Sequence, residues 1–420
     1  MSLSAAGGVN VIGAGLAGSL LAILLAKRGF NVTVYERRAD PRLAAADGGR
    51  SINLALAARG IRGLQLAGVL DRVMKFAIPM RGRMVHEHDG GAALQLYGVR
   101  PEEVIYSVAR GDLNRVLIEA AAEMPNVEFR FGQLCVGFAH ERNALEMREE
   151  GTGQIHHTEA RPSIATDGAG SRMRDALLAR EVATVREEAL DHDYKELTIP
   201  PVDGKPALDV NALHIWPRGG FMLIALPNPD NTFTATLFLA RSGANSFEEL
   251  RAADAVDAFF SREFPSARAL MPDLTREFFE HPQGSLGTVY TKGWHLDGDV
   301  LLLGDAAHAI VPFHGQGMNC AFEDCAELDR LMGEHHSWAG LFEAFEHSRR
   351  PNTDAIAQMA LENYLEMREA VLDPEYRRRK AEAEALEKKD PNFIPRYSMV
   401  MFHPEIPYAE AQRRSQRAVS

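Results

Sequence analysis

The residues with the clearest chemical purpose are three glycines near the start of the chain. The sequence Gly-Ala-Gly-Leu-Ala-Gly at residues 13–18 fits the GxGxxG pattern and lies between an apolar segment, 9–12, and a segment of helical composition, 19–28. This spacing permits a tight turn, lets a pyrophosphate approach the backbone and places it at a helix N-terminus. Glu36 ends the next expected strand, where an acidic side chain can bind ribose hydroxyls. We therefore predict a dinucleotide site rather than a glycine cluster that serves only helix packing.

A second glycine-rich turn occurs much later in the chain. Residues 301–308 read Leu-Leu-Leu-Gly-Asp-Ala-Ala-His, and residues 315–319 read Gly-Gln-Gly-Met-Asn before another helical stretch. Such a turn can bind an anion or a carbonyl, and Asp305, at the end of the apolar strand, can accept a hydrogen bond from a ribose or ribitol hydroxyl. The alternative is an ordinary strand–helix turn that Asp305 caps.

The elements that position these turns indicate an α/β protein. Residues 9–36 read as strand, helix and strand, which is one βαβ unit. Alternating segments within 81–106 and 197–241 predict strands of a second sheet. Residues 51–66 are expected to form a helix broken by Gly60 and Gly63, and 322–387 to form successive helices.

Composition excludes several classes of protein. The chain has 420 residues, of which 46% are hydrophobic and 25% charged, as in ordinary globular proteins. The net charge of -12, without a basic stripe, argues against a nucleic-acid partner. The glycines in 9–26 and the lack of other long apolar runs argue against a membrane span. Three cysteines without CxxC spacing favour a reducing compartment, so we expect a cytoplasmic protein. The histidines of 86–89 and 335–336 lack ligand spacing, so no metal is expected.

The chain resembles a known family in three separate places. These are the first glycine turn with Glu36, the sequence Asp-Gly-Ala-Gly-Ser at 167–171 with Arg174, and the sequence at 304–308 with Pro312. They are similar to the three fingerprints of the FAD-dependent aromatic hydroxylases, the single-component group A flavoprotein monooxygenases. Within that group, residues 49–56, 311–325 and 362–368 resemble the members that hydroxylate L-kynurenine. Two departures are Ala109, where a serine is usual, and the sequence Ile-Ala-Thr at 164–166.

The resemblance implies tightly but non-covalently bound FAD. The residues implied for this cofactor belong to the two glycine turns and their surroundings: Gly13, Ala14, Gly15, Ala17, Gly18, Glu36, Arg37, Ala55, Arg110, Leu134, Asp305, Gly317, Met318 and Asn319. Because the chain has one GxGxxG sequence, NADPH is expected to lack a Rossmann domain of its own and to act as a transient reductant. FAD-binding residues are expected at 1–80, 100–180 and 285–330, a sheet-rich substrate domain at 81–99 and 181–284, and a helical region at 331–420.

The resemblance also implies that L-kynurenine is held by Arg83, Tyr97, Asn363 and Tyr397. These residue types suit a substrate with a carboxylate, an ammonium group, a ketone and an aniline ring. Arg83 can bind a carboxylate through two hydrogen bonds, and the tyrosine hydroxyls and the amide can add more. Without a ligand, Arg83 would be a solvated strand arginine and the two tyrosines would be ordinary residues at the edge of the core.

Four apolar residues of the second sheet could line a slot for the ring: Leu213, Met222, Ile224 and Phe238. Met222 and Ile224 alternate on one strand and so share a face. An equally good interpretation is plain sheet core. His314 lies in the turn expected above the flavin and could contact the substrate, or it could be a loop histidine, so its catalytic role is left open.

The implied reaction uses NADPH to reduce FAD, adds O2 at the flavin C4a position, and hydroxylates the ring through that hydroperoxide to give 3-hydroxy-L-kynurenine. The amino group already activates the ring, so we assign no general base. The protein must orient the ring and exclude water. Two alternatives are a flavin hydroxylase of another aromatic acid and a flavin-fold binding protein without redox turnover. If the chain associates, the expected assembly is a homodimer.

Overall fold

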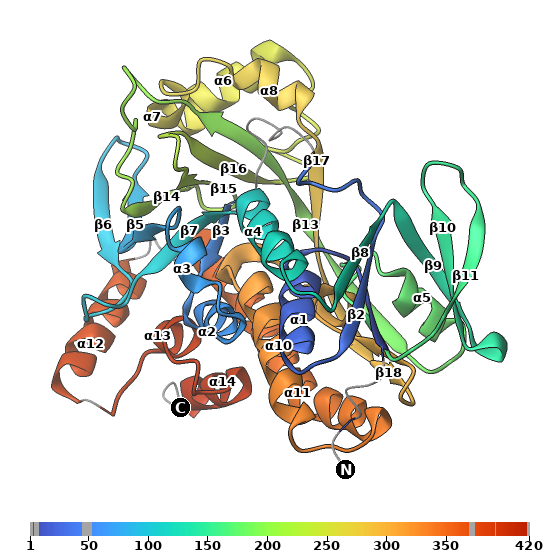
Figure 1. Cartoon of the computed structure of the whole chain (residues 1–420). Coiled ribbons are helices and arrows are strands. Elements are labelled where there is room, and N and C mark those ends of the chain that lie inside the picture. The colour runs from blue at the N-terminus through green and yellow to red at the C-terminus, as the bar shows by residue number, and fades with distance from the viewer. Residues whose placement is uncertain (1–2, 4–7, 44–52, 369–373, 391, 418–420) are drawn as a thin grey trace.

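The computed structural model describes residues 3, 8–43, 53–368, 374–390 and 392–417. A mostly parallel sheet contains the strand before the first glycine turn and the strand that ends at Glu36 (Figure 1). Its strands, in spatial order, are β18 (His295–Leu296), β19 (Val300–Leu302), β12 (Ser163–Ala165), β1 (Gly8–Ile12), β2 (Asn31–Glu36) and β8 (Val127–Phe131). Only β18 runs antiparallel to its neighbour in this sheet. The predicted βαβ unit is therefore confirmed.

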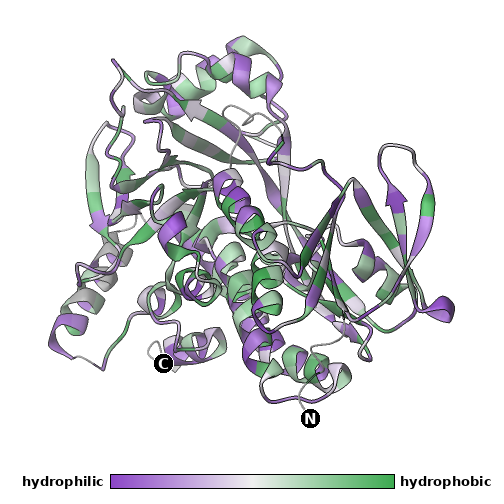
Figure 2. Cartoon of the chain, in the orientation of Figure 1, coloured by the Kyte–Doolittle hydropathy of each residue, from purple (hydrophilic) through white to green (hydrophobic). Residues whose placement is uncertain are grey.

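Helices α1 (Leu16–Lys27) and α4 (Arg110–Ala122) pack against this sheet and bury its apolar residues. The same hydrophobic core includes residues of α5 (Arg172–Leu178), α9 (Asp305–His308) and α10 (Gly317–Met332). Helix α1 packs against α4 and α10, and its residues from Gly18 to Ala26 are all buried. Figure 2 shows α1 as mostly apolar along its length, as its central place requires.

A seven-stranded sheet forms the second part of the fold. Its strands, in spatial order, are β17 (Gln283–Lys292), β13 (Thr184–Ile199), β16 (Phe233–Ala240), β15 (Met222–Pro227), β14 (Ala212–Pro217), β5 (Gly82–His86) and β6 (Ala92–Leu96). Three helices pack on one face of it: α6 (Ala253–Glu263), α7 (Pro265–Arg268) and α8 (Leu274–Glu280). The opposite face is turned toward the glycine turns. The predicted domain boundaries stay a prediction.

Two small sheets and a helical C-terminal region complete the described chain. The small sheets are β11 (Ile155–Glu159), β10 (Ala144–Glu149) and β9 (Gln133–Ala139), and β3 (Asn53–Leu56), β7 (Ile105–Ala109) and β4 (Ile78–Met80). The remaining helices are α2 (Ala58–Ala67), α3 (Leu70–Val73), η1 (His140–Arg142), η2 (Pro312–His314), α11 (Trp338–Arg368), α12 (Pro374–Lys389), α13 (Arg396–Met401) and α14 (Tyr408–Arg417). The predicted α/β class with a helical C-terminal region is confirmed.

One predicted element is wrong. Residues 53–56, expected to begin a helix over 51–66, form strand β3, and the helix begins only at Ala58. Strand β3 pairs with β7, about fifty residues away in sequence, with Ala55 opposite Ser107. This long-range pairing overrides the helical composition of a short segment. Residues 49–52, the first half of the 49–56 sequence, lie outside the described residues.

Candidate functional site

The first glycine turn leaves room for a ligand at the start of α1. Gly13 has φ of +98°, and a Cβ there would lie 2.7 Å from the Thr166 carbonyl oxygen. A Cβ at Gly18 would overlap the Gly13 carbonyl oxygen. Gly15, the N-cap of α1, differs, because no atom counted around its Cβ position lies within 4 Å. Two glycines therefore serve packing, and the third keeps space open beside a helix N-terminus that lacks a side-chain cap.

Glu36 lies beside this turn, as the sequence pattern predicts. Its carboxylate accepts hydrogen bonds from the backbone amides of Ala14, at 2.8 Å, and Arg38, at 2.9 Å. The Thr166 hydroxyl, one of the departures from the family pattern, donates to the Ile12 carbonyl oxygen at 2.9 Å. The end of β12 thus holds the end of β1, and the turn is fixed from both sides.

The second glycine turn is held by buried charges. Gly304 has φ of +63°, and its amide donates to the Asp324 carboxylate at 3.2 Å. The same carboxylate lies 2.6 Å from His308 Nε2 and accepts from Arg349 Nε at 2.6 Å. Burial would raise the pKa of Asp324, but His308 and Arg349 hold that pKa below its usual value. Asp324 therefore stays charged and fixes the strand–helix turn that carries Asp305.

Asp305 faces a cavity and can be reached by solvent from it. The surrounding protein removes part of the water around the Asp305 carboxyl and so raises its pKa, and the nearby charges of His308 and Arg110 oppose this rise. Burial raises the pKa of Tyr194 and of Glu196 on β13, and the charge of Arg110, the first residue of α4, opposes the rise. The charge of Arg110 therefore acts on three residues that line the cavity, Asp305, Tyr194 and Glu196.

Asn319 ties the second turn to β3. Its Nδ2 donates to the carbonyl oxygens of Ala55 and Gly315, both at 2.8 Å, and its Oδ1 accepts from the Ala57 amide at 2.9 Å. Gly315 has φ of +64°, and Gly317, at the start of α10, has open space where a Cβ would lie. Because both amide hydrogens of Asn319 are used, its side chain braces the turn, and the predicted ligand contact would come from the backbone.

A cavity of about 360 Å³ lies between the second turn and the second sheet. Its lining includes these residues predicted from sequence: Ala55, Arg83, Tyr97, Leu213, Met222, Ile224, Phe238, Asp305, His314 and Tyr397. Sequence reasoning missed a polar strip of the same sheet face, which consists of Tyr194, Glu196, Thr234 and Thr236. The alternation of β13 and β16 could have revealed it, since Thr234, Thr236 and Phe238 share one face.

Arg83 and three rings form a stacked group at one end of the cavity. The Arg83 guanidinium carbon lies 4.9 Å from the Tyr397 ring centroid and 5.7 Å from that of Tyr97. The Tyr397 ring stacks on Tyr97, with centroids 5.5 Å apart, and on His314. The Tyr97 hydroxyl is buried without a well-formed hydrogen bond among the described residues. Burial raises the pKa of this hydroxyl, and the charge of Arg83 opposes the rise. A buried cation beside an unsatisfied hydroxyl can bind a carboxylate.

His314 is buried and neutral. Burial and the Arg83 charge lower the pKa of His314 to about 3. Its Nδ1 has no hydrogen-bond partner in the described part of the chain. The ring can therefore exchange a hydrogen bond with a ligand, but it carries no charge near neutral pH.

Other predicted residues lie outside the cavity lining. Asn363 is buried behind the wall, where its Nδ2 donates to the Phe313 carbonyl oxygen at 2.6 Å. Leu134 lies on β9, opposite Arg148, and Arg37 is exposed after β2. Met318 is buried in the first turn of α10. Ala109 precedes α4 and provides no side-chain cap, as expected where a serine is absent.

Histidines at two places outside the cavity have structural partners. His86 Nε2 lies 2.8 Å from His214 Nδ1, and the His86 ring stacks on Trp216 with centroids 4.2 Å apart. Among the described residues, His308, Cys320 and Asp324 bring possible ligand atoms within 4.8 Å of one another. Arg349 already binds the Asp324 carboxylate, so a second cation would be repelled there. We interpret this cluster as an ion-pair network.

No helix in the described ranges combines the length and the apolar composition needed to cross a bilayer.

Comparisons with known proteins agree with this geometry. The family described as "FAD binding domain" matches residues 8–360. The chain is 48% identical to kynurenine 3-monooxygenase of Stenotrophomonas maltophilia (strain K279a), over 97% of this chain and 90% of that protein. It is 47% identical to the kynurenine 3-monooxygenase of Myxococcus xanthus (strain DK1622), over 95% of this chain and 86% of that protein.

Solved structures share the fold. The tetrameric form of 2-methyl-3-hydroxypyridine-5-carboxylic acid oxygenase has a TM-score of 0.70 at 19% identity and covers 94% of this chain and 96% of its own. PqsL of P. aeruginosa, solved in complex with 2-aminobenzoylacetate, has a TM-score of 0.67 at 20% identity and covers 87% of this chain and 99% of its own. At these identities the two structures establish the architecture alone.

Proposed function

The chain belongs to the family of kynurenine 3-monooxygenases and is an FAD-dependent monooxygenase, and from this premise we propose that it converts L-kynurenine to 3-hydroxy-L-kynurenine with NADPH and O2. The observation that carries the proposal is the group formed by Arg83, Tyr97 and Tyr397 at one end of a cavity whose other wall is the second glycine turn.

The residues present fit FAD. Gly15 and Gly317 keep space open at the starts of α1 and α10, and neither helix has a side-chain cap. The first turn with Glu36 would hold the adenosine and pyrophosphate groups, whereas Arg110, Asp305 and the second turn would hold the ribitol and the ring system. When bound, FAD would supply electron transfer from NADPH and activation of O2.

The substrate would lie along the face of the second sheet. Arg83 would bind the α-carboxylate through paired hydrogen bonds, and the unsatisfied Tyr97 hydroxyl would add a donor. The ring would rest on Met222, Ile224 and Phe238, which occupy neighbouring strands β15 and β16 with Met222 opposite Phe238. Asn363 would act indirectly, because it holds the Phe313 carbonyl and Phe313 lines the cavity.

The protein's part in the chemistry is orientation and exclusion of water. Phe313 stacks on Tyr364, with ring centroids 3.9 Å apart, and packs edge-on against Phe238 at 4.9 Å. These rings keep the wall apolar where a reactive oxygen species must not meet water. His314 would exchange a neutral hydrogen bond with the substrate, and no side chain needs to take a proton from the activated aniline ring.

The test is to measure NADPH oxidation and O2 uptake by the FAD-loaded protein, with and without L-kynurenine. We expect L-kynurenine to stimulate both, and we expect a product that gains one oxygen at the carbon next to the amino-bearing carbon. Hydroxybenzoate and salicylate serve as comparison substrates. Stimulation by one of these acids and not by L-kynurenine would instead indicate a hydroxylase of another aromatic acid.

A further inference from the structure

The cavity residue Tyr397 is carried by a helix that cannot hold its own position. Helix α13 comprises six residues, and isolated helices of this length are unstable in water. Tyr397 is in its first turn, with its ring stacked between Tyr97 and His314. Contacts between α13 and the rest of the fold must therefore set where this ring lies.

Arg59 makes an unusual set of contacts with the C-terminal segment, residues 396–417. It belongs to α2 and is 1% exposed. Its guanidinium donates to main-chain oxygens just after Tyr397, namely those of Val400 (3.4 Å), His403 (3.3 Å) and Ile406. A cation that binds carbonyl oxygens at the end of a helix stabilises that end.

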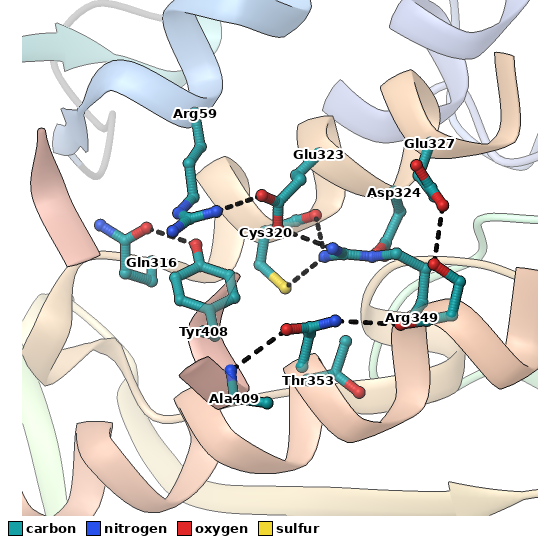
Figure 3. A network of polar contacts seen from close by, with 12 residues as sticks. Arg59, Gln316, Cys320, Glu323, Asp324, Glu327, Arg349, Thr353, Tyr408 and Ala409 are labelled. Atoms are coloured by element: carbon teal, nitrogen blue, oxygen red, sulfur yellow. Dashed lines mark hydrogen bonds and ion pairs between the residues drawn. The ribbon is translucent and has the colours of Figure 1, made fainter. Parts of the chain in front are cut away.

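A carboxylate and an aromatic ring balance the positive charge of Arg59. Figure 3 shows Arg59 extending from α2 toward Glu323 and Tyr408. It forms an ion pair with Glu323 of α10, and its guanidinium carbon lies 3.9 Å from the Tyr408 ring centroid. One buried side chain thus joins α2, α10 and the C-terminal segment.

The other polar side-chain contacts of α13 in this region are either partly exposed to water or long. Arg396 pairs with Glu362 and Glu366, but all three side chains are partly exposed, so water screens these pairs. Ser398 Oγ reaches Glu103 at 3.5 Å, at the limit of a hydrogen bond. Among the contacts described, Arg59 is the buried charged side chain that bonds to main-chain oxygens in and just after α13.

The same segment also contacts the second glycine turn. The Tyr408 hydroxyl donates to Gln316 Oε1 at 2.7 Å, and Gln316 Nε2 lies 3.0 Å from Met401 Sδ (Figure 3 shows the first of these contacts). Gln316 is the N-cap of α10, and Met401 lines the cavity. The turn expected to hold the flavin and the helix that carries Tyr397 therefore share one buried network.

We propose that Arg59 is a positioning residue that holds the C-terminal segment against the cavity and so places Tyr397 for substrate binding. The inference rests on the proposed function, because L-kynurenine is the ligand whose binding it affects. Arg59 does not line the cavity, so it acts on a substrate through the segments that it binds, and Tyr397 and Met401 are the cavity residues of the C-terminal segment.

The test compares Arg59→Met and Arg59→Lys with Arg62→Met, which alters an exposed arginine of the same helix. We expect Arg59→Met to raise the Kd and KM for L-kynurenine by about 10- to 100-fold, the scale of a small misplacement of binding groups. It should leave the Kd for FAD within about twofold and increase hydrogen exchange in 396–402. Lysine, which keeps the charge but cannot bind three oxygens and a carboxylate at once, should restore part of the affinity. Arg62→Met should behave as the unaltered protein.

Tyr408→Phe gives a second test should Arg59→Met fail to fold, because it removes only the hydroxyl bonded to Gln316. It too should raise the KM for L-kynurenine and loosen 396–402. Unchanged L-kynurenine binding and hydrogen exchange in the folded variants would overturn the inference, and so would an equal loss of FAD binding and kcat at constant KM, which is the mark of general destabilisation. Failure of the unaltered protein to bind L-kynurenine would instead contradict the proposed function.

Discussion

The ring of Tyr397 stacks on the ring of His314, with centroids 5.4 Å apart and planes 14° from parallel. His314 ends the short helix before the second glycine turn, whereas Tyr397 belongs to the C-terminal helices. The turn expected to hold the cofactor and the cavity expected to hold the substrate therefore share a wall, which is built from distant parts of the sequence. The predictions that follow separate what each part of this wall does.

Arg83→Ala should weaken L-kynurenine binding by roughly 2–5 kcal/mol, the range for losing one partner of a buried charge pair. Arg83 is 9% exposed and packs over two tyrosine rings, so water would screen its ion pair with the substrate carboxylate only weakly. Titration of the FAD-loaded protein with L-kynurenine measures the change. Arg81→Ala, an exposed arginine at the start of the same segment, is the matched control. Equal affinity in the Arg83 and Arg81 variants would remove Arg83 from the substrate site.

Gly15→Ala should separate FAD binding from folding. Gly15 has φ of -72° and open space where a Cβ would lie, so alanine fits the free protein without strain. The methyl group would occupy the space a pyrophosphate needs, so the Kd for FAD should rise at least about tenfold, equivalent to roughly 1.4 kcal/mol. Fluorescence titration with FAD and thermal unfolding without FAD measure the two effects.

Gly18→Ala is the contrasting variant for the same turn. Its Cβ would overlap the Gly13 carbonyl oxygen, so the FAD-free protein itself should lose stability. If Gly15→Ala lowered the unfolding temperature as much as Gly18→Ala and left FAD affinity unchanged, the first turn would serve packing alone.

His314→Gln should leave the pH profile of kcat unchanged between about pH 6 and 8. With its pKa lowered to about 3, His314 is neutral throughout this range and transfers no proton. Glutamine keeps a neutral hydrogen-bonding group, so the loss of kcat should be smaller than the about 10²–10⁴-fold typical of a missing acid or base. Steady-state kinetics across this pH range provide the measurement. Loss of a profile inflection together with a large fall in kcat would assign His314 a proton-transfer role.

The sequence predicts those parts of the site that depend on local pattern. The turn at Gly13 and Gly15 lies between adjacent elements, and Asp305 directly follows an apolar strand, so spacing alone indicates both. Resemblance to a family was needed to select Arg83, Tyr97 and Tyr397. In the structure, Arg83 and Tyr97 come together through the paired strands β5 and β6, whereas Tyr397 comes from a separate helix far along the chain.

Residues that act through long-range contacts escaped prediction. Arg59 and Asp324 read as ordinary charged residues of helices, and only the fold shows that both are buried and bound to backbone groups of distant segments. Asn363 was placed in the substrate site, yet its amide holds the Phe313 carbonyl from behind. A single sequence gives residue types and their spacing, but it does not show which buried polar groups form hydrogen bonds with each other. That pairing depends on tertiary packing.

The partly buried His86, paired with the buried His214, should make the protein sensitive to mild acid. Burial, together with the nearby His214 and Arg218, lowers the pKa of His86 from 6.5 to about 4. In the unfolded chain His86 would bind a proton near pH 6.5, whereas in the folded protein it does so only near pH 4. Stability should therefore fall as the pH drops from about 6.5 to 4, and His86 should contribute nothing to this slope above that window.

His86→Gln isolates this contribution, because glutamine can still donate to His214 Nδ1 but does not titrate. Urea unfolding at a series of pH values should show that the variant takes up roughly one proton fewer on unfolding across this window. The exposed His88→Gln is the matched substitution on the same segment. An identical acid slope in the His86 variant and the unaltered protein would mean that His86 binds its proton at the same pH in the folded and the unfolded chain, which its contact with the His214 ring nitrogen argues against.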